Sequence, residues 1–363
     1  MAYDILIVGA GITGATLAQV LTERGKKCLV VERRDEIGGN CRDEMREGIL
    51  VHNYGPHIFH TSNPELWNYV NRFTTFNHFI NAPVANYKGT IYNLPFNMNT
   101  FSKLWGVTTP QEAKEELEHQ RVKYNHEPRN LEEQALSLTG RDIYEKLIRG
   151  YTEKQWGRQC SELPASILER IPFRYVYNNN YYNDAYQGIP TDGYTDMLRC
   201  MLNGVEVRCC VDYLADRKTL DHLASRTVYT GMIDAFFQYS EGVLQYRTLR
   251  FESEALKMQN YQGVAVVNYT DAETPFTRII EHKHFAFGTQ PNTIITREFP
   301  AEWHFGAEPF YPVNDERNTT LYEEYRKMAE RERDVSFCGR LAEYHYRDMA
   351  TAIEKALLLA KRL

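Results

Sequence analysis

The chain has 363 residues, with 42 Lys and Arg against 48 Asp and Glu, and a formal net charge of −6. It contains no clustered run of Lys or Arg, which argues against a broad surface for nucleic acid. Any anionic ligand is therefore expected to be small and held by a few arginines. Tyrosine (25 residues) outnumbers phenylalanine (17), and because tyrosine carries a hydroxyl this favours a polar, concave cleft.

The size predicts two or three domains. No apolar run approaches the roughly 20 residues of a spanning helix, and the first residues lack a signal-peptide pattern, so we expect a cytoplasmic protein that does not insert into membranes. Seven scattered cysteines without a CxxC pair predict reduced thiols. His57 and His60 lack a third ligand, so no metal site is expected.

The first 32 residues predict a complete βαβ unit. Residues 4–8 form an apolar run typical of a buried strand, and the sequence GAGITG follows at residues 9–14. A helix is expected over 15–24 and a second buried strand over 28–31, closed by Glu32. Strand, glycines, helix and acidic terminus occur in the order of a dinucleotide-binding fingerprint.

The glycines and Glu32 have defined roles in such a site. Gly11 allows the backbone to approach a pyrophosphate at the helix N-terminus, and Glu32 can accept hydrogen bonds from ribose hydroxyls. The Ile-Gly-Gly segment at residues 37–39 resembles FAD enzymes of the glutathione-reductase-like superfamily, so FAD is the expected nucleotide. The late strand before Gly339 resembles their ribityl-binding segment, with Arg340 where many members have Asp.

The remaining chain alternates between helical and β patterns. Helices are expected within 99–160, 192–202, 320–333 and 348–362, strands at 205–211, 227–230 and 335–338, β alternation over 244–290, and a loop over 164–190. Rossmann-type elements at both ends predict an α/β fold whose nucleotide domain is assembled from separate pieces. The predicted domains are FAD-binding (1–80, 191–232 and 313–363), helical (98–172) and antiparallel sheet (81–97, 173–190 and 233–312).

Several longer strings carry a family resemblance. GYTEKQWGRQCSELPASILERIPFRY begins at Gly150 and GRLAEYHYRDM begins at Gly339. With NNNYYNDAYQGIPTDGY between them, they resemble bacterial UDP-galactopyranose mutase, and the resemblance runs from residue 3 to about residue 360. It implies a flavin-dependent isomerase that interconverts UDP-galactopyranose and UDP-galactofuranose without net redox change.

The resemblance also implies a mechanism and partners. Reduced FAD would form an N5–sugar adduct while UDP leaves and returns, and the product would supply surface polysaccharide synthesis. The partners would be UDP-galactose, an external reductant such as NAD(P)H, and a second copy of the chain in a homodimer. A mobile loop ending the helical domain, with Arg170 just before Pro172, would close over the substrate.

Site residues follow from matching positions. The resemblance implies catalytic roles for Arg170, Arg278, His57 and Asp348. It implies substrate contacts at Asn81, Tyr151, Thr152, Trp156, Arg170, Tyr181, Arg247, Asn268, Arg278, Tyr311 and Tyr346. The cofactor contacts expected from the fingerprint and the resemblance are Gly9, Gly11, Thr13, Gly14, Glu32, Arg33, Gly39, Asn40, His57, Ile58, Arg340, Tyr346, Asp348 and Met349.

Other readings stay open. An FAD oxidase or dehydrogenase of amines or sugar alcohols would use the same cofactor domain, and a mutase could prefer an N-acetylated UDP-sugar. An NAD-dependent epimerase needs Tyr and Lys spaced YxxxK, and none of the 25 tyrosines has that spacing. The chain departs from the family at Met232, usually Pro, and at Thr13, often aromatic.

Overall fold

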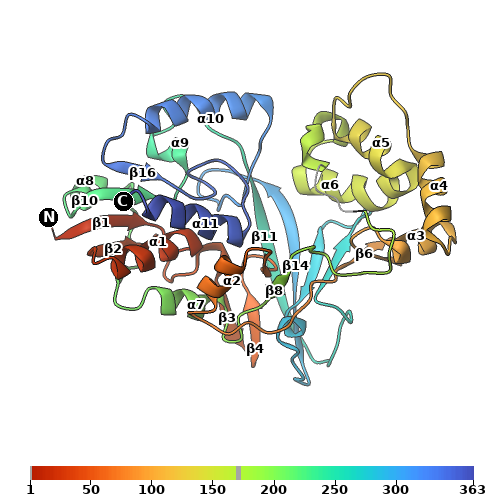
Figure 1. Cartoon of the computed structure of the whole chain (residues 1–363), viewed down its shortest axis with the longest axis horizontal. Helices are drawn as coiled ribbons and strands as arrows, with labels where there is room; N and C mark the ends of the chain where they lie inside the picture. The colour runs from red at the N-terminus through yellow and green to blue at the C-terminus, as the bar shows by residue number, and fades with distance from the viewer. Residues whose placement is uncertain (1, 169–172) are drawn as a thin grey trace.

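The nucleotide-binding part is built on a five-stranded parallel sheet. The computed structural model describes residues 2–168 and 173–363 (Figure 1). The strand order is β16-β10-β1-β2-β9. The strands are β1 (Tyr3–Val8), β2 (Cys28–Val31), β9 (Glu206–Arg208), β10 (Ala224–Tyr229) and β16 (Val335–Phe337). Strands from three distant stretches of sequence thus lie side by side, as predicted.

Two helices pack together against this sheet. Helix α1 (Ile12–Glu23) follows β1, and α11 (Met349–Ala360) comes from the far end of the sequence; Figure 1 shows them next to each other. β2 is buried along its whole length, as expected for a strand covered on both faces. The predicted βαβ unit is confirmed.

A seven-stranded sheet forms the centre of the molecule. Its order is β15-β11-β14-β13-β12-β6-β7, and every pair is antiparallel except β12–β6. The strands are β6 (Val84–Tyr87), β7 (Thr90–Asn93), β11 (Tyr246–Leu256), β12 (Val266–Tyr269), β13 (Arg278–Glu281), β14 (Thr293–Glu302) and β15 (Tyr311–Pro312). Cross-strand partners place Arg278 opposite Glu298 and Arg247 opposite Glu302, so these four side chains share one face.

The helical lobe has its own core and stands apart from the nucleotide-binding part in Figure 1. It comprises α3 (Met98–Trp105), α4 (Pro110–Gln120), α5 (Leu131–Ile143), a π-helical turn (Tyr144–Ile148) and α6 (Arg149–Trp156). Asn130 caps α5 by accepting from the Glu133 amide at 2.9 Å. The Glu133 carboxylate bonds to Arg129, so no capping box forms with Asn130.

Shorter elements connect these units: α2 (Pro64–Val70), β3 (Asp43–Arg46), β4 (Ile49–His52), β5 (Phe59–Thr61), β8 (Tyr186–Gly188), α7 (Tyr194–Met201), α8 (Arg217–Asp221), α9 (Ile233–Phe236) and α10 (Glu316–Ala329). Helix α10 begins four residues before its predicted start, because Asp315 caps it by accepting from the Asn318 amide. β8 pairs with β5, which joins the 186–188 stretch to the nucleotide-binding part. We propose that the chain divides into the three predicted domains, with residues 186–188 assigned to the nucleotide-binding part instead of the sheet domain.

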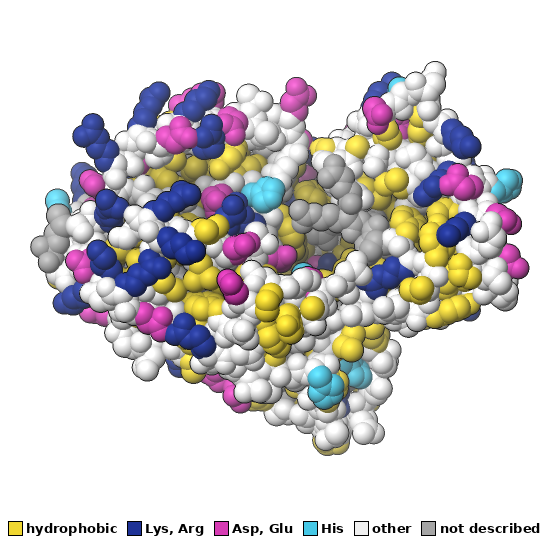
Figure 2. All heavy atoms as spheres, in the orientation of Figure 1, with side chains coloured by type: hydrophobic (Ala, Val, Ile, Leu, Met, Phe, Trp, Pro, Cys, Tyr) yellow, Lys and Arg dark blue, Asp and Glu magenta, His cyan; other side chains and the backbone are white. Residues whose placement is uncertain are grey.

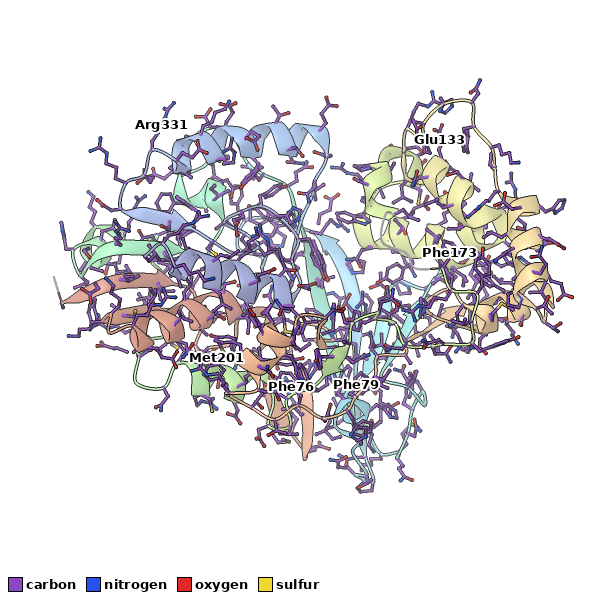
Figure 3. All side chains as sticks on the ribbon, in the orientation of Figure 1. Phe76, Phe79, Glu133, Phe173, Met201 and Arg331 are labelled. Carbon is purple, nitrogen blue, oxygen red and sulfur yellow. The ribbon has the colours of Figure 1, made fainter. Side chains whose placement is uncertain are left out.

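Side-chain packing follows the same units. Phe79 and Met201 lie in the core cluster that includes α1 and β1, and Phe76 packs against it, whereas Phe173 packs against the core of the helical lobe (Figure 3). Arg331 is exposed on the outer surface. Within the described ranges, 2–168 and 173–363, no helix is long and apolar enough to span a bilayer.

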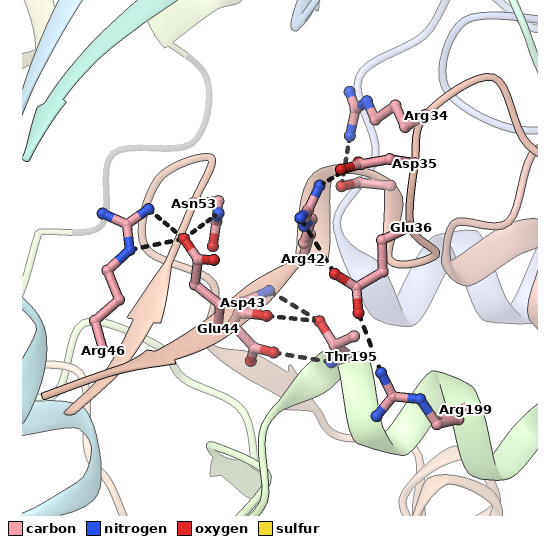
Figure 4. A network of polar contacts seen from close by, with 11 residues as sticks. Arg34, Asp35, Glu36, Arg42, Asp43, Glu44, Arg46, Asn53, Thr195 and Arg199 are labelled. Atoms are coloured by element: carbon pink, nitrogen blue, oxygen red, sulfur yellow. Dashed lines mark hydrogen bonds and ion pairs between the residues drawn. The ribbon is translucent and has the colours of Figure 1, made fainter. Parts of the chain in front are cut away.

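A polar network fixes the β3 strand against α7 (Figure 4). The buried Asp43 carboxylate accepts from the amides of Tyr194 (2.6 Å) and Thr195 (3.0 Å), the first residues of α7. Burial raises the pKa of Asp43, whereas these hydrogen bonds oppose that rise. Nearby, Glu36 lies 3.2 Å from Arg42 and 3.1 Å from Arg199. The network holds the 35–43 segment, which borders the nucleotide cavity.

Candidate active site

A cavity of about 440 Å³ lies at the carboxyl ends of the parallel strands, the expected place for a ligand in such a sheet. The glycine-rich turn, the end of β2 and the start of α11 all contribute to its wall. Of the predicted cofactor residues, those lining it are Gly9, Gly11, Thr13, Gly14, Glu32, Arg33, Gly39, Asn40, His57, Arg340, Asp348 and Met349. Ile58 packs in the core and Tyr346 lies outside this cavity.

The glycine turn fits a dinucleotide. A Cβ on Gly14 would lie 1.9 Å from the Gly9 carbonyl oxygen, so only glycine allows α1 to start this close to β1. Gly9 has a φ of +104°, which favours glycine. Gly11 is the N-cap of α1 and no side chain caps its amides, which leaves them for a pyrophosphate.

Glu32 is held in position by the backbone. Its carboxylate accepts from the Ala10 amide at 2.8 Å and from the Arg34 amide at 2.9 Å. Each carboxylate oxygen retains a second lone pair, and the residue lines the cavity. These donors and acceptors suit the pyrophosphate and ribose of FAD.

Two walls of the cavity were missed by sequence reasoning. One is the 211–214 segment after β9, and the other is the 303–309 segment between β14 and β15. Glu308 in the second segment lies 2.5 Å from Arg33 and 2.9 Å from Arg34. The partners of each ion pair are more than 270 residues apart in the sequence, so no local pattern predicts the contact. The one available signal was the presence of an acidic residue in this loop.

Replacing Glu308 with alanine is expected to raise the dissociation constant of FAD by up to about fivefold. The ion pairs tie the 303–309 wall to the end of β2, but they are partly exposed, so their effect is small. Flavin fluorescence on titration of the apoprotein measures it. Glu273→Ala, which breaks an exposed ion pair with Lys88 away from the cavity, is the control, and equal affinities in both variants would contradict the assignment.

Two buried histidines, His52 and His282, stand behind the half-buried His57 at the cavity. The His57 amide donates to Nδ1 of His52 at 3.2 Å, and the His52 amide donates to Nδ1 of His282 at 3.2 Å. Nε2 of His282 lies 2.7 Å from the Thr296 hydroxyl. Burial lowers the pKa of His57 to about 4 and that of His282 to about 3, and it also lowers the pKa of His52. All three rings are therefore neutral near pH 7.

The neutral state of His57 defines what it offers the cavity. Its Nδ1 lies 2.9 Å from the Gly55 carbonyl oxygen, which can only accept, so Nδ1 carries the proton in the neutral ring. Nε2 then has a free lone pair. His57 lines the nucleotide cavity, so it presents a hydrogen-bond acceptor, not a cation, to the cofactor.

Acidification from pH 7 to pH 5 is expected to lower the free energy of unfolding. The folded pKa values of His57 and His282 lie below the unfolded value of about 6.5. Their contribution to the free energy of unfolding is therefore present above about pH 6.5 and is lost as the pH falls toward 4. One such histidine accounts for roughly 2 kcal/mol between pH 6.5 and 5. In urea titrations at both pH values, His282→Gln should lose less stability than the parent; an equal loss would refute this explanation.

A second group of predicted residues gathers around Arg278 on the central sheet. Its Nη2 donates to the Tyr151 hydroxyl of α6, and its Nε lies 3.2 Å from Oε1 of Glu298. Glu298 is fully buried, and among the described residues neither of its oxygens has a hydrogen-bond donor in good geometry. Burial raises the pKa of Glu298, and Arg278 opposes that rise. Sequence reasoning missed Glu298, although an acidic residue on the inward side of a strand was a usable signal.

Tyrosines surround this arginine. Burial raises the pKa of Tyr181 and Tyr311, and Arg278 acts in the opposite direction on both, which places them within its field. The ring of Tyr346 lies 5.8 Å from that of Tyr311 and 4.7 Å from the Arg340 guanidinium. Tyr346 thus links Arg340, which lines the nucleotide cavity, to Tyr311 of the Arg278 group.

Helix α6 reaches the sheet because of a glycine. A Cβ on Gly150 would lie 2.5 Å from the Thr270 carbonyl oxygen. Lys154, one turn later, donates to the carbonyl oxygens of Tyr269 (2.8 Å), Thr274 (3.0 Å) and Phe276 (3.1 Å). These contacts bring Tyr151 to Arg278. The roles of Gly150 and Lys154 were not predicted from the sequence.

Two predicted amides flank the same group. Asn268 lies opposite Arg278 in the β12–β13 pair, and its buried Oδ1 has no hydrogen-bond partner among the described residues. The Asn81 carbonyl accepts from the Tyr181 amide at 2.7 Å. Buried polar groups are normally satisfied, so an unpaired amide oxygen beside Arg278 favours a polar ligand there.

Other predicted residues lie elsewhere. Arg247 and Trp156 line a neighbouring cavity that contains neither Arg278 nor Tyr311. Arg170 and the start of the predicted closing loop fall outside the described residues. Thr152 lies on α6 and is half-buried. Its contact with substrate stays a prediction.

The start of α11 serves both helix and cavity. Asp348 caps α11 by accepting from the Thr351 amide at 2.7 Å and also lines the cavity. Arg340 donates to the carbonyl oxygens of Phe310 (3.2 Å) and Arg347 (2.7 Å). Among the described residues its hydrogen-bond acceptors are these two neutral oxygens, so its charge remains available to an electron-rich cofactor.

Known proteins resemble the chain over its whole length. A family model described as UDP-galactopyranose mutase matches residues 146–346, more than half of the chain, and a model for an NAD(P)-binding Rossmann-like domain matches residues 7–73. A dTDP-fucopyranose mutase from Escherichia coli is 38% identical over 98% of this chain and 97% of its own length. A probable UDP-galactopyranose mutase from Klebsiella pneumoniae is 38% identical over 98% and 94%.

A solved structure agrees with these matches. The crystal structure of a reduced UDP-galactopyranose mutase superposes with a TM-score of 0.79, at 16% identity, and covers 100% of this chain and 94% of that one. The matches do not favour the oxidase and N-acetyl-sugar alternatives. The chain therefore belongs to the UDP-galactopyranose mutase family, and it is an FAD-dependent isomerase that interconverts the pyranose and furanose forms of a sugar.

Proposed function

We propose that the substrate is UDP-galactopyranose and that the product is UDP-galactofuranose. The observation that carries the proposal is the Arg278 group, in which a half-buried cation, tyrosine hydroxyls and an unpaired Asn268 oxygen meet next to the nucleotide cavity. A nucleoside diphosphate needs such a cation, and a sugar needs such hydroxyl and amide partners. The name of the relative from Klebsiella pneumoniae agrees with this substrate.

The residues around the substrate have separate roles in this proposal. Arg278, with Arg170 from outside the described ranges, binds the diphosphate and stabilises its charge as the nucleotide leaves the sugar. Tyr181, Tyr311 and Tyr346 donate hydrogen bonds to phosphate or sugar oxygens. Bound FAD, in its reduced form, supplies the nucleophile for the anomeric carbon.

Three groups act at the cofactor. His57 accepts a hydrogen bond through Nε2, Arg340 favours the electron-rich form by its charge, and Asp348 orients hydroxyl groups beside the start of α11. Because the ring of the sugar must open and close, the site must exclude water during that interval. The predicted closing loop around Arg170 is our candidate for this task.

A second substrate is favoured by one specific finding. The relative from Escherichia coli, as similar to this chain as the Klebsiella pneumoniae protein, is named a dTDP-fucopyranose mutase. Such a substrate differs in its base and in the sugar. The diphosphate, which Arg278 would bind, is common to both.

The test is a direct assay of both nucleotide sugars. The purified holoenzyme is reduced with dithionite and incubated with UDP-galactose or with dTDP-fucose, and chromatography separates pyranose from furanose. A furanose product from UDP-galactose, at a kcat/KM at least tenfold above that for dTDP-fucose, supports the first substrate. The reverse ratio would transfer the proposal to the second, and absence of either product would refute both.

We also propose that NAD(P)H reduces the flavin, that the chain works as a homodimer, and that it is cytoplasmic. A reductant is required because the reduced cofactor is the active form, and NAD(P)H is the one we propose. The seven cysteines are all free in the structure, which is typical of a reducing compartment. Anaerobic flavin bleaching by NADH and NADPH, and light scattering of the holoenzyme, test the reductant and the oligomeric state.

A further inference from the structure

A chain of hydrogen bonds runs from the central sheet to His57 at the nucleotide cavity. It begins at Thr296 on β14, whose hydroxyl lies 2.7 Å from Nε2 of His282. Nδ1 of His282 accepts from the His52 amide at 3.2 Å, and Nδ1 of His52 accepts from the His57 amide at 3.2 Å. Neither His52 nor His282 is among the predicted site residues, and the proposed function leaves both without a role.

The backbone donors fix the tautomer of both rings. A backbone N–H can only donate, so Nδ1 of His52 and Nδ1 of His282 must each carry a lone pair. In a neutral ring the proton then lies on Nε2. Nε2 of His282 donates this proton to Thr296, whereas Nε2 of His52 has no hydrogen-bond partner among the described residues.

The unpaired Nε2 of His52 indicates that this ring is present for its other nitrogen. His52 is 1% exposed, stacks on Phe285 at 4.6 Å and lies edge-on to Tyr194 at 5.8 Å. An apolar side chain would fill this aromatic cage without burying an unpaired donor, which destabilises a fold. The ring is nevertheless there, and the one hydrogen bond that it forms within residues 2–168 and 173–363 is the one to the His57 amide.

The strand at which the chain begins also supports the Arg278 group. Thr296 and Glu298 are two residues apart on β14, so they point to the same side of the sheet. A Cβ on Gly55 would lie 3.2 Å from Oε2 of Glu298, so the loop that ends at His57 rests on the residue that pairs with Arg278. The hydrogen-bond chain therefore ties the cofactor side of the site to the substrate side.

We propose that His52 and His282 are positioning residues, which hold His57 at a fixed place relative to the sheet that carries Arg278. The inference rests on the proposed role of His57 at the cofactor. Reaction at the anomeric carbon needs the groups at the cofactor and those at the diphosphate in one geometry, because a misplacement of about 1 Å can cost about a hundredfold in rate. Three consecutive hydrogen bonds between the two sides supply that geometry.

The tautomers test the chain in the unaltered holoenzyme, so this result does not depend on how any variant folds. Nitrogen NMR of protein labelled at its histidine rings should show Nδ1 without a proton in both His52 and His282. The His52→Asn and His282→Asn variants assign the two sets of resonances. A proton on Nδ1 of either ring would overturn the proposal.

Two substitutions at His52 separate positioning from packing. Asparagine keeps an acceptor at the place of Nδ1, whereas leucine removes the acceptor and keeps the bulk. His52→Leu should speed hydrogen exchange at the His57 amide and lower kcat, each by about threefold to tenfold, with KM unchanged, because one hydrogen bond is lost. His52→Asn should behave as the parent in both measurements. Ile294→Val, a buried apolar change where β14 packs on β4, is the packing control and should alter neither.

A combination with His57→Ala distinguishes the possible failures. If His52 acts through His57, adding His52→Leu to His57→Ala should slow turnover no further, and additive losses would contradict the proposal. Equal effects of leucine and asparagine at His52 would reduce that residue to a packing role. If His57→Ala changes neither turnover nor the midpoint potential of the flavin, the proposed role of His57 is wrong and this inference fails with it. If His57→Ala changes them and His52→Leu does not, the inference alone is wrong.

Discussion

Replacing Arg278 with alanine is expected to lower turnover by about a hundredfold or more while FAD stays bound. The change removes the cation that donates to Tyr151 and acts on Tyr181 and Tyr311, and charge-assisted contacts contribute about 1.5–3 kcal/mol each. The glycine turn and Glu32 are separate from Arg278, so flavin absorbance should be retained. Steady-state kinetics with the dithionite-reduced enzyme measure the loss.

The same substitution has a second consequence for stability. It leaves Glu298 buried without its positive partner, and breaking a buried ion pair typically costs about 3–5 kcal/mol. Adding Glu298→Gln to Arg278→Ala should recover part of this stability without recovering turnover. Arg250→Ala, on the exposed side of β11 beside Glu252, is the control. Turnover of Arg278→Ala close to that of this control would refute the role of Arg278.

Replacing Gly14 with alanine is expected to abolish FAD retention and to destabilise the fold by several kcal/mol. The new Cβ would lie 1.9 Å from the Gly9 carbonyl oxygen and 3.3 Å from Ile7, so α1 would have to move away from β1. Because β1 and α1 carry the start of the nucleotide cavity, the pyrophosphate site would be lost with it. Flavin content after purification and a urea titration measure both effects.

Gly11→Ala is the matched comparison. Gly11 has a φ of −81°, and its Cβ would meet only Gly39, at an ordinary 3.5 Å. This variant should fold with nearly the parent stability and lose affinity for FAD alone, since a methyl group would occupy the approach of the pyrophosphate. Similar unfolding midpoints for Gly14→Ala and Gly11→Ala would contradict the steric explanation.

Much of the nucleotide site could be predicted because it is local in sequence. The glycine turn, Glu32 and the paired strands lie within 32 residues, and periodicity and glycine spacing report such local geometry directly. The helices of the helical lobe could likewise be predicted from their apolar periodicity. The substrate residues came from the family resemblance. The structure places Tyr151, Tyr181 and Tyr311 near Arg278, and their contact with substrate stays a prediction.

The missed residues depend on contacts between distant segments. Gly150 matters because of Thr270, and Glu308 matters because of Arg33, so no local pattern reveals them. Arg247, a substrate contact by the resemblance, packs against Gly157 and lines a neighbouring cavity, and its contact with substrate stays a prediction. The one usable signal was Glu298, a charge on the inward side of an alternating strand.

Figure 2 shows the surface of the folded molecule, which is hollowed between the nucleotide-binding part and the helical lobe. The packing of α11 on α1 within the nucleotide-binding part has a consequence for biosynthesis. Gly339, Arg340, Asp348 and Met349 complete a cavity that is also lined by Gly9, Gly11 and Glu32, from a much earlier part of the sequence. The nascent chain therefore cannot form its cofactor site until residues 339–360 have been synthesised. Until then the apolar side of α1 that α11 covers in the folded protein stays exposed.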